Sequence, residues 1–310
     1  MIKITAFGPL THSFTLTTLT IAGLVACQTQ PTKVTENKII EKEMTPFYQL
    51  SKQMKAPIEI TKNQVIVDVR SHFDYTLAHI PNSIHLTWEE FSQVRGSTPG
   101  LLKKNLTYLA KRLALKGISP ESQVLVVGKG LHGQGEEGRM AWTLFYLGVH
   151  QIQIANIENF HKMLTNRESP PLKNAKTWTP QVTHFARTSL HEILKAAMSS
   201  SKTISKKIHI LDVRSKQEYF HSKGKGLGVA YQTPNMKPTH IYWKEFFSNR
   251  GQVKLNMKKK ILAIGIGVDD RILVISNKGV RSGAVTMALL AMGFTKAANY
   301  TGGYSQLLTR

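Results

Sequence analysis

The chain has 310 residues, which is enough for two domains of ordinary size. Lys and Arg outnumber Asp and Glu by 41 to 19, and the resulting net charge of +22 favours anionic ligands and surfaces. Cys27 is the only cysteine, which excludes a disulfide within the chain and a zinc site built from several cysteines.

The first segment has the pattern of a signal peptide. Lys3 is the only Lys, Arg, Asp or Glu in the first 32 residues, and residues 14–26 form an apolar stretch that ends in Leu24-Val25-Ala26-Cys27. This pattern resembles a bacterial lipoprotein signal peptide, with residues 1–26 removed. A transmembrane anchor is the alternative, but the apolar run is shorter than the ~20 residues that cross a bilayer.

Cys27 is then the residue that carries the lipid, as a thioether. The mature protein would be lipid-anchored in the cell envelope and would have no free thiol. Gln28 follows the cysteine, which in this resemblance favours the outer over the inner membrane of a Gram-negative cell. Residues 27–45 are polar and charged with few aromatic residues, as expected for a tether.

The remainder of the chain contains an internal repeat. One motif occurs twice, as Val67-Asp68-Val69-Arg70-Ser71 and as Leu211-Asp212-Val213-Arg214-Ser215. The sequence of residues 84–91 is likewise similar to that of residues 239–246. A duplicated domain explains two such pairs of similar segments better than chance does. We therefore expect a first domain at residues 46–168, a linker at 169–184 and a second domain at 185–310.

Each copy has the pattern of an α/β domain. Short apolar runs predict strands at residues 65–69 and 124–127 in the first copy, and at 208–213 and 272–275 in the second. In each copy, one helical pattern precedes the first strand, and an apolar helical pattern follows the second strand and ends near Leu147-Gly148 or Met292-Gly293. Buried strands that alternate with helices predict a mainly parallel sheet with helices on both faces. Ligand sites in such folds lie beyond the carboxyl ends of the strands.

The loop at residues 276–282 occupies such a position, between the strand at 272–275 and an apolar helix from residue 284. Free N–H groups and the dipole at a helix N-terminus attract anions, so we predict an anion-binding loop. Its members are Ser276, Asn277, Lys278, Gly279, Val280, Arg281 and Ser282. Ser276 is most simply a hydroxyl that bonds within its own turn. A serine nucleophile needs an adjacent base, and none can be placed beside it from the sequence.

These motifs resemble the tandem-domain rhodanese family of thiosulfate and mercaptopyruvate sulfurtransferases. Residues 276–282 fit the family pattern Cys-x-x-Gly-x-Arg-Ser except that Ser276 replaces the cysteine that carries sulfur as a persulfide. Asp68-Val69-Arg70 and His79-Ile80-Pro81 are similar to two further signatures. The resemblance implies two rhodanese-like domains with a non-catalytic first copy. Because oxygen cannot replace sulfur in a persulfide, we expect no catalytic residue in the second copy either.

The sequence also predicts roles for several residues outside the loop at 276–282. The loop that begins at Gly128 is rich in glycine, but Glu136 and Glu137 would repel phosphate, so we interpret it as structural. Glu218 stands where the resemblance places a substrate-binding arginine. We expect buried structural roles for Arg70 and Arg214, a turn-stabilising role for His79, and core positions for Trp88 and Trp243. The 12 histidines show no metal-ligand spacing, and we expect no metal or cofactor.

The function predicted from these observations is a membrane-anchored rhodanese-like protein without sulfurtransferase activity. It would bind an anionic ligand or a protein partner at residues 276–282. One alternative is an active thiosulfate or 3-mercaptopyruvate sulfurtransferase-like enzyme that uses other chemistry at the same loop. Another is an envelope interaction module whose basic surface contacts anionic lipid headgroups. Nucleic acid is not an expected partner because no binding motif is present.

Overall fold

A computed structural model describes residues 57–94, 98–198, 207–221 and 236–308, together with Lys52, Met54 and Lys55. All of them belong to one compact unit, Glu41–Arg310. The predicted signal peptide at 1–26, the lipidation site Cys27 and the tether at 27–45 lie outside the described residues. Within the described ranges, no helix is long and apolar enough to cross a bilayer.

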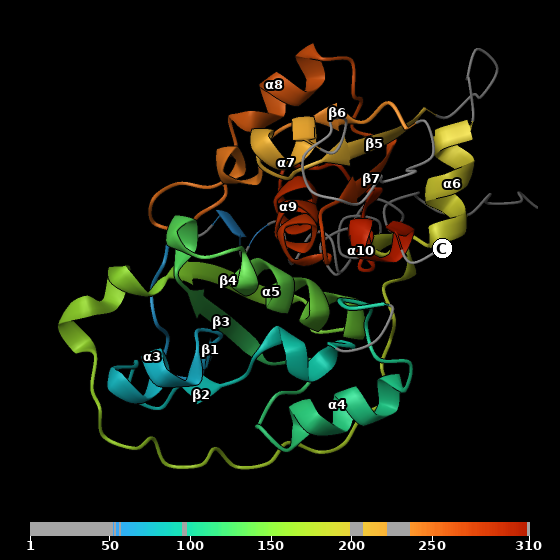
Figure 1. Cartoon of the computed structure of the whole chain (residues 1–310). Helices are drawn as coiled ribbons and strands as arrows, with labels where there is room; N and C mark the ends of the chain where they lie inside the picture. The colour runs from blue at the N-terminus through green and yellow to red at the C-terminus, as the bar shows by residue number, and fades with distance from the viewer. Residues whose placement is uncertain are drawn as a thin grey trace, which may run out of the picture. The chain divides into compact units, whose positions relative to one another are not determined.

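The first copy is built on a four-stranded parallel sheet with the order β2-β1-β3-β4 (Figure 1). Its strands are β1 (Val65–Asp68), β2 (Ile84–His85), β3 (Gln123–Gly128) and β4 (Gln151–Asn156). Its α-helices are α3 (His72–Leu77), α4 (Leu106–Ala114) and α5 (Glu136–Leu147). Short 3-10 helices lie at Trp88–Phe91, Gly130–His132 and Ile157–Met163.

The second copy repeats this arrangement with the strand order β6-β5-β7-β8, again all parallel. Its strands are β5 (Ile208–Asp212), β6 (Thr239–His240), β7 (Arg271–Ile275) and β8 (Ala297–Asn299). Its α-helices are α6 (Leu190–Met198), α7 (Lys216–His221), α8 (Met257–Ala263), α9 (Val280–Ala291) and α10 (Gly303–Leu308), and 3-10 helices lie at His184–Ala186 and Trp243–Phe246. The repeat seen in the sequence is therefore a repeat of topology, and the predicted α/β fold is confirmed.

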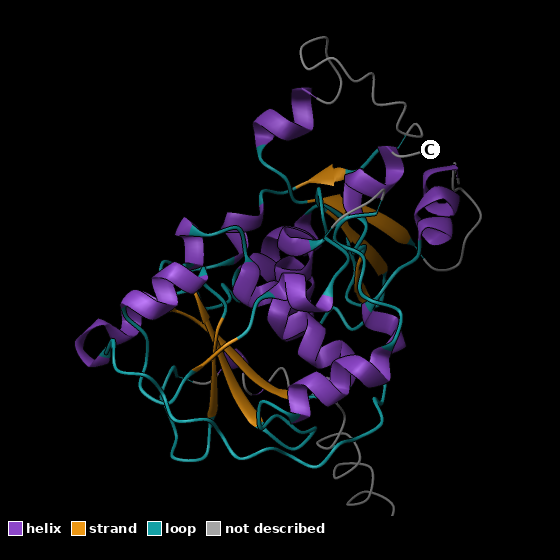
Figure 2. Ribbon diagram, turned by 60° about the horizontal axis from the view of Figure 1, so that its bottom comes forward, coloured by secondary structure: helices purple, strands orange, loops and turns teal. Residues whose placement is uncertain are grey.

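Alternate residues of each central strand belong to different hydrophobic clusters, because side chains along a strand point to opposite faces of the sheet. In the second copy, Leu273 of β7 packs in a cluster with Ile193 of α6 and Tyr304 of α10. Its neighbours in the strand, Ile272 and Val274, belong to the cluster that includes α9. Helices consequently cover both faces of the sheet (Figure 2).

Helices α5 and α9 join the two copies. Both contribute to one continuous hydrophobic cluster, and they lie against each other (Figure 1). A Cβ added at Gly138 of α5 would lie 2.3 Å from the Cβ of Ala284 in α9. The two helix backbones can approach this closely only because position 138 has no side chain.

Gly138→Ala is therefore expected to destabilise the protein, although alanine is the better helix former by about 1 kcal/mol. The added methyl group would force α5 and α9 apart, and overpacking of this kind costs about 1–3 kcal/mol. Urea unfolding of the variant measures the effect. The double variant Gly138→Ala/Ala284→Gly removes the opposing methyl group and should recover part of the loss. A Gly138→Ala protein as stable as the wild type would contradict the predicted close packing.

Candidate functional site

Residues 276–282 lie at the carboxyl end of β7 and run into the N-terminus of α9. The helix begins at Val280, earlier than the apolar pattern indicated, so Val280, Arg281 and Ser282 form its first turn. Gly279 precedes them with a φ of 73°, a left-handed conformation that favours glycine. A Cβ at this position would lie 2.4 Å from the carbonyl oxygen of Thr301. The tight turn into α9 thus depends on this glycine.

Ser276 takes part in a chain of hydrogen bonds inside the loop. Its side chain is buried, and its Oγ accepts the backbone N–H of Ser282 at 3.2 Å. Ser282 Oγ donates to Asn299 Oδ1 at 2.7 Å, which leaves Ser276 Oγ to donate to Ser282 Oγ at 3.0 Å. None of these partners is a base that could take the proton of Ser276 at neutral pH. The geometry gives this hydroxyl a structural role in the turn.

A carboxylate from α7 contacts two side chains of the loop. Glu218 Oε1 accepts from Asn277 Nδ2 at 2.7 Å and from one terminal nitrogen of Arg281 at 2.8 Å. Its Oε2 accepts from the other terminal nitrogen of Arg281 at 2.6 Å, and from the N–H and Oγ of Ser215 at 2.9 and 2.8 Å. Asn277 and Arg281 of the predicted anion-binding loop therefore surround an anion that belongs to the chain itself.

These contacts control the ionisation of Glu218. Burial alone would raise its pKa, but hydrogen bonds from Arg281 and Ser215 outweigh burial and lower the pKa from an ordinary value of 4.5 to about 2. The pKa is lower in the folded than in the unfolded chain, so the ionised carboxylate stabilises the fold above pH 4.5, and this contribution is lost as the pH falls towards 2.

Glu218→Gln is accordingly expected to destabilise the protein at neutral pH and to change its stability little near pH 2. Glutamine keeps the shape of the side chain but cannot pair with the charge of Arg281. Urea unfolding of both proteins at a series of pH values measures the difference between them. A difference that stays constant across this range would show that the ionised carboxylate contributes no pH-dependent stability.

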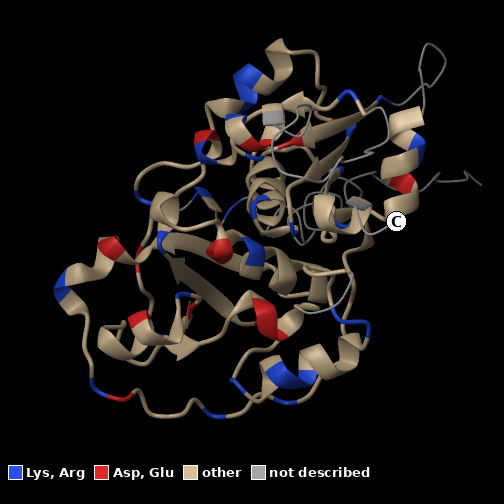
Figure 3. Cartoon of the chain, in the orientation of Figure 1, with Lys and Arg blue, Asp and Glu red and all other residues tan. Residues whose placement is uncertain are grey.

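Lys278 is the other cation of the loop, and it is exposed. Across the described ranges of the chain, no carboxylate lies within ion-pair distance of its ammonium group. Since Glu218 neutralises Arg281, Lys278 supplies the remaining positive charge of residues 276–282. Other Lys and Arg residues are spread over α4, α6 and α8, which belong to both copies (Figure 3).

Beneath the loop, the Asp-x-Arg motif is a buried structural pair, as predicted. Asp212 is fully buried at the end of β5 and accepts from the Nε and a terminal nitrogen of Arg214 at 2.8–3.1 Å. Tyr304 Oη also donates to it, at 2.9 Å. In the first copy, Asp68 and Arg70 form the same pair.

A residue of the first copy supports the loop of the second. Arg139 of α5 is fully buried and donates to the carbonyl oxygen of Gly279 at 2.9 Å. It also donates to Ser92 Oγ and to the carbonyl of Gly100, at 2.9 and 2.8 Å. Burial lowers its pKa to about 9. The sequence offers no signal for this role, because residues 139 and 279 meet only when α5 packs on α9.

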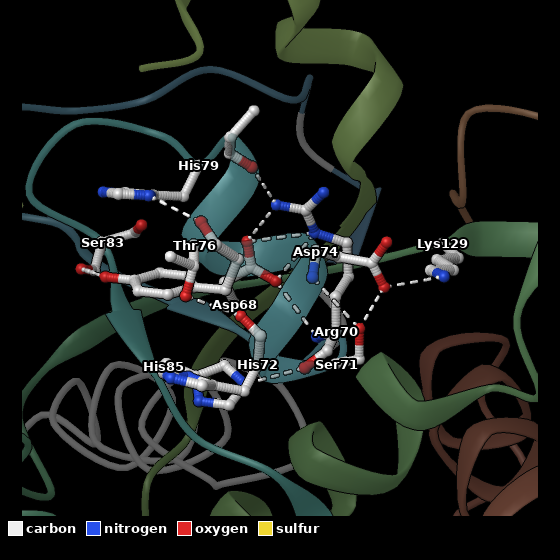
Figure 4. Close-up of polar contacts among 12 residues, drawn as sticks. Asp68, Arg70, Ser71, His72, Asp74, Thr76, His79, Ser83, His85 and Lys129 are labelled. Atoms are coloured by element: carbon white, nitrogen blue, oxygen red, sulfur yellow. Dashed lines mark hydrogen bonds and ion pairs between the residues drawn. The ribbon is translucent and has the colours of Figure 1, made fainter. Parts of the chain in front are cut away.

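The corresponding place in the first copy holds a cavity of about 250 Å3, lined by Gly128, Lys129 and Trp88 among others. Asp74 of α3 pairs there with Lys129 at 2.8 Å (Figure 4). In the second copy, Glu218 of α7 pairs with Arg281 in a similar way. The expectation that Trp88 lies in the core is wrong, because this side chain is only partly buried and lines the cavity, whereas Trp243 is a core residue.

Within the described ranges, no group of three or more His, Cys, Asp or Glu residues is placed to hold a metal ion.

Several solved structures share the fold, and one of them is described as a sulfurtransferase. A probable thiosulfate sulfurtransferase superposes with a TM-score of 0.56 at 21% identity, over 81% of this chain and 96% of its own. The Tum1 protein from Saccharomyces cerevisiae gives a TM-score of 0.62 at 14% identity, over 84% of this chain and 93% of its own. A tyrosine-to-alanine variant of EanB in complex with ergothioneine gives a TM-score of 0.65 at 16% identity, over 87% of this chain and 66% of its own.

Sequence comparison identifies the family directly. No curated protein matches the chain. The family model for the rhodanese-like domain matches twice, at residues 50–157 and 191–309, and these two ranges contain the two parallel sheets described above. With both copies matched over most of its length, the chain belongs to the family of proteins with rhodanese-like domains.

Proposed function

We propose that this protein is a rhodanese-like binding protein that does not transfer sulfur and that binds a small anion at residues 276–282. The position that would need a thiol is occupied by Ser276, whose hydroxyl bonds within the loop. The only cysteine of the chain, Cys27, precedes both rhodanese-like domains in the sequence. A serine oxygen cannot hold the sulfur that a persulfide carries, so binding is the function left to this loop.

The contacts of Glu218 are the observation that carries the proposal. Five hydrogen bonds from Asn277, Arg281 and Ser215 converge on its carboxylate. Hydrogen bonds to an ionised group are stronger than those between neutral groups, and two parallel N–H groups of an arginine match the shape of an oxyanion. An external anion of similar size would use the same donors, together with the exposed Lys278. It would bind in competition with Glu218.

This competition gives the proposal its test. Sulfate is titrated into the wild-type chain and into Glu218→Gln by calorimetry at low ionic strength. Glu218→Gln frees Arg281 and removes a repelling charge, so we expect it to bind sulfate at least about tenfold more tightly, a change of roughly 1.4 kcal/mol. Replacing Arg281 by Gln as well should remove the gain. Glu121→Gln, at an exposed position, changes the net charge equally and serves as the control.

If Glu218→Gln bound sulfate no better than Glu121→Gln, anion binding at the loop would be excluded. The same holds if the gain persisted after Arg281→Gln, since sulfate would then bind elsewhere on this basic protein. Either result would favour the alternative in which binding is carried by the general basic surface.

We further propose that Cys27 is lipidated and holds the protein on a membrane of the cell envelope. The apolar stretch before it and the polar segment after it support this anchor. The anchor would also bring the excess Lys and Arg near anionic headgroups, each adding about 1 kcal/mol of attraction.

Cys27→Ala is expected to release the protein from the membrane fraction. Metabolic labelling with a fatty acid should label the wild type and fail to label the variant, because the thioether is the site of attachment. Ser276→Ala is the matched control and should remain labelled. Equal labelling of Cys27→Ala and wild type would contradict this proposal.

A further inference from the structure

The cavity of the first copy lies beyond the carboxyl ends of β1 and β3. Three segments build its wall: the turn after β1, the 3-10 helix Trp88–Phe91, and the loop after β3 with the start of α5. It occupies the position in its own domain that residues 276–282 occupy in the other. With a volume of about 250 Å3, it has room for a small organic molecule.

The two cations of the wall are already paired. The Nε and a terminal nitrogen of Arg70 donate to Asp68, and the same terminal nitrogen donates to the carbonyl of Ala78 at 2.6 Å (Figure 4). Lys129 Nζ lies 2.8 Å from a carboxylate oxygen of Asp74. Each of these positive charges is thus balanced by a carboxylate of the same domain.

The acids of the wall have no such partner. Glu89 and Glu136 form no ion pair with any residue in the described part of the chain. Glu136 Oε2 accepts only the backbone N–H of Gln134, at 2.7 Å. Desolvation raises the pKa of Glu89. Hydrogen bonds from its own backbone N–H and from Thr87 oppose this rise, and the nearby charge of Glu136 adds to it. Two carboxylates therefore face the same cavity without a cation to pair with them.

Two buried ionisable side chains behind the wall, Glu137 and Arg139, also affect the charge around the cavity. Glu137 lies against Gly128, with its Oε2 2.4 Å from where a Gly128 Cβ would be, and this oxygen has no hydrogen-bond partner. Burial raises the pKa of Glu137 to about 8, so it is mostly neutral at neutral pH. Arg139 lies 5.8 Å from the centre of the Trp88 ring and offsets part of the acidic charge. The two acids of the wall that have no ion pair within the described ranges thus outnumber the one arginine behind it.

We propose that this cavity binds a small organic monocation, with a primary ammonium or guanidinium group held between Glu89 and Glu136 and the rest of the molecule against Trp88. Carboxylates supply acceptors for the N–H groups of such a cation, and an indole ring adds attraction through its π-electrons. The site has the opposite charge preference to residues 276–282. It does not depend on the function proposed for that loop.

The probe for this site is n-butylammonium, with butyrate as the anion of the same length. Each is titrated into the full chain at low ionic strength, and the indole N–H signal of Trp88, assigned with Trp88→Phe, is followed by NMR. We expect a saturable shift with butylammonium and none with butyrate. Glu89→Gln/Glu136→Gln should weaken butylammonium binding at least about tenfold. Glutamine keeps an oxygen that can accept the N–H of Gln134, so the local fold should persist.

The matched control is Glu121→Gln/Glu168→Gln, which changes the net charge equally at two exposed positions. This control should bind butylammonium as the wild type does. Equal weakening in both double variants would show that general electrostatic attraction, and not this cavity, holds the cation. Saturable binding of butyrate, or no saturable binding of butylammonium, would overturn the proposal.

Discussion

Asp212→Ala is expected to destabilise the protein by about 3–5 kcal/mol, the cost of leaving one member of a buried ion pair without its partner. Arg214 would keep its positive charge in a site where its side chain is only 7% exposed. The hydroxyl of Tyr304, which donates to Asp212 at 2.9 Å, would lose its acceptor as well. Denaturant unfolding, followed by circular dichroism, measures the loss.

Two variants separate charge from packing in that experiment. Asp212→Asn keeps the volume and one acceptor oxygen but loses the charge, so it should lie between wild type and Asp212→Ala. Asp212→Ala/Arg214→Leu also removes the buried guanidinium that has lost Asp212, and it should be more stable than Asp212→Ala alone. If the double variant were the less stable of the two, the buried charge would not be the main cost.

A large gain in thiosulfate:cyanide sulfurtransferase activity is expected when a thiol is placed at position 276 and the charge of Glu218 is removed. In a Cys27→Ala background, Ser276→Cys would provide the only thiol of the chain. It would lie at the N-terminus of α9, where the N–H of Ser282 and the helix dipole favour a thiolate. Thiosulfate is a dianion, however, and Glu218 occupies the donors that it would need.

We therefore expect Ser276→Cys alone to convert thiosulfate and cyanide to thiocyanate slowly, and Ser276→Cys/Glu218→Gln to do so at least about tenfold faster, or roughly 1.4 kcal/mol lower in barrier. In this reaction the thiolate takes the outer sulfur and releases sulfite, and cyanide then removes the sulfur as thiocyanate. Intact-mass measurement of the persulfide provides an independent readout. A double variant no faster than Ser276→Cys would show that Glu218 does not block the loop.

The sequence predicted the fold because the signals are local and strong. Short, β-branched apolar runs such as 272–275 favour buried strands when helical patterns flank them, and the duplicated Asp-x-Arg motif marked the same strand in both copies. The buried structural role of Arg214 was also expected from the sequence, and the structure identifies Asp212 as the carboxylate that accepts its hydrogen bonds.

The side-chain contacts of the candidate site, and above all the pairing of Arg281, could not be predicted from the sequence in the same way. Whether Arg281 is free or paired depends on the position of α7, which brings Glu218 across 63 residues of sequence. The resemblance drew attention to Glu218 because an arginine was expected at its position, but its contacts with Asn277 and Arg281 carry no sequence signal. The prediction that Trp88 is a core residue was wrong for a related reason. An aromatic residue beside a cavity has the same local sequence pattern as one in the core.

The central claim, a rhodanese-like fold that binds without sulfur transfer, is tested most directly by the thiosulfate:cyanide reaction of the unaltered full chain. We predict that thiocyanate forms no faster than in the absence of protein, because Ser276 has neither a sulfur atom nor a base beside it. Thiocyanate formation that saturates with thiosulfate and disappears in Ser276→Ala would contradict the account and identify the chain as an enzyme.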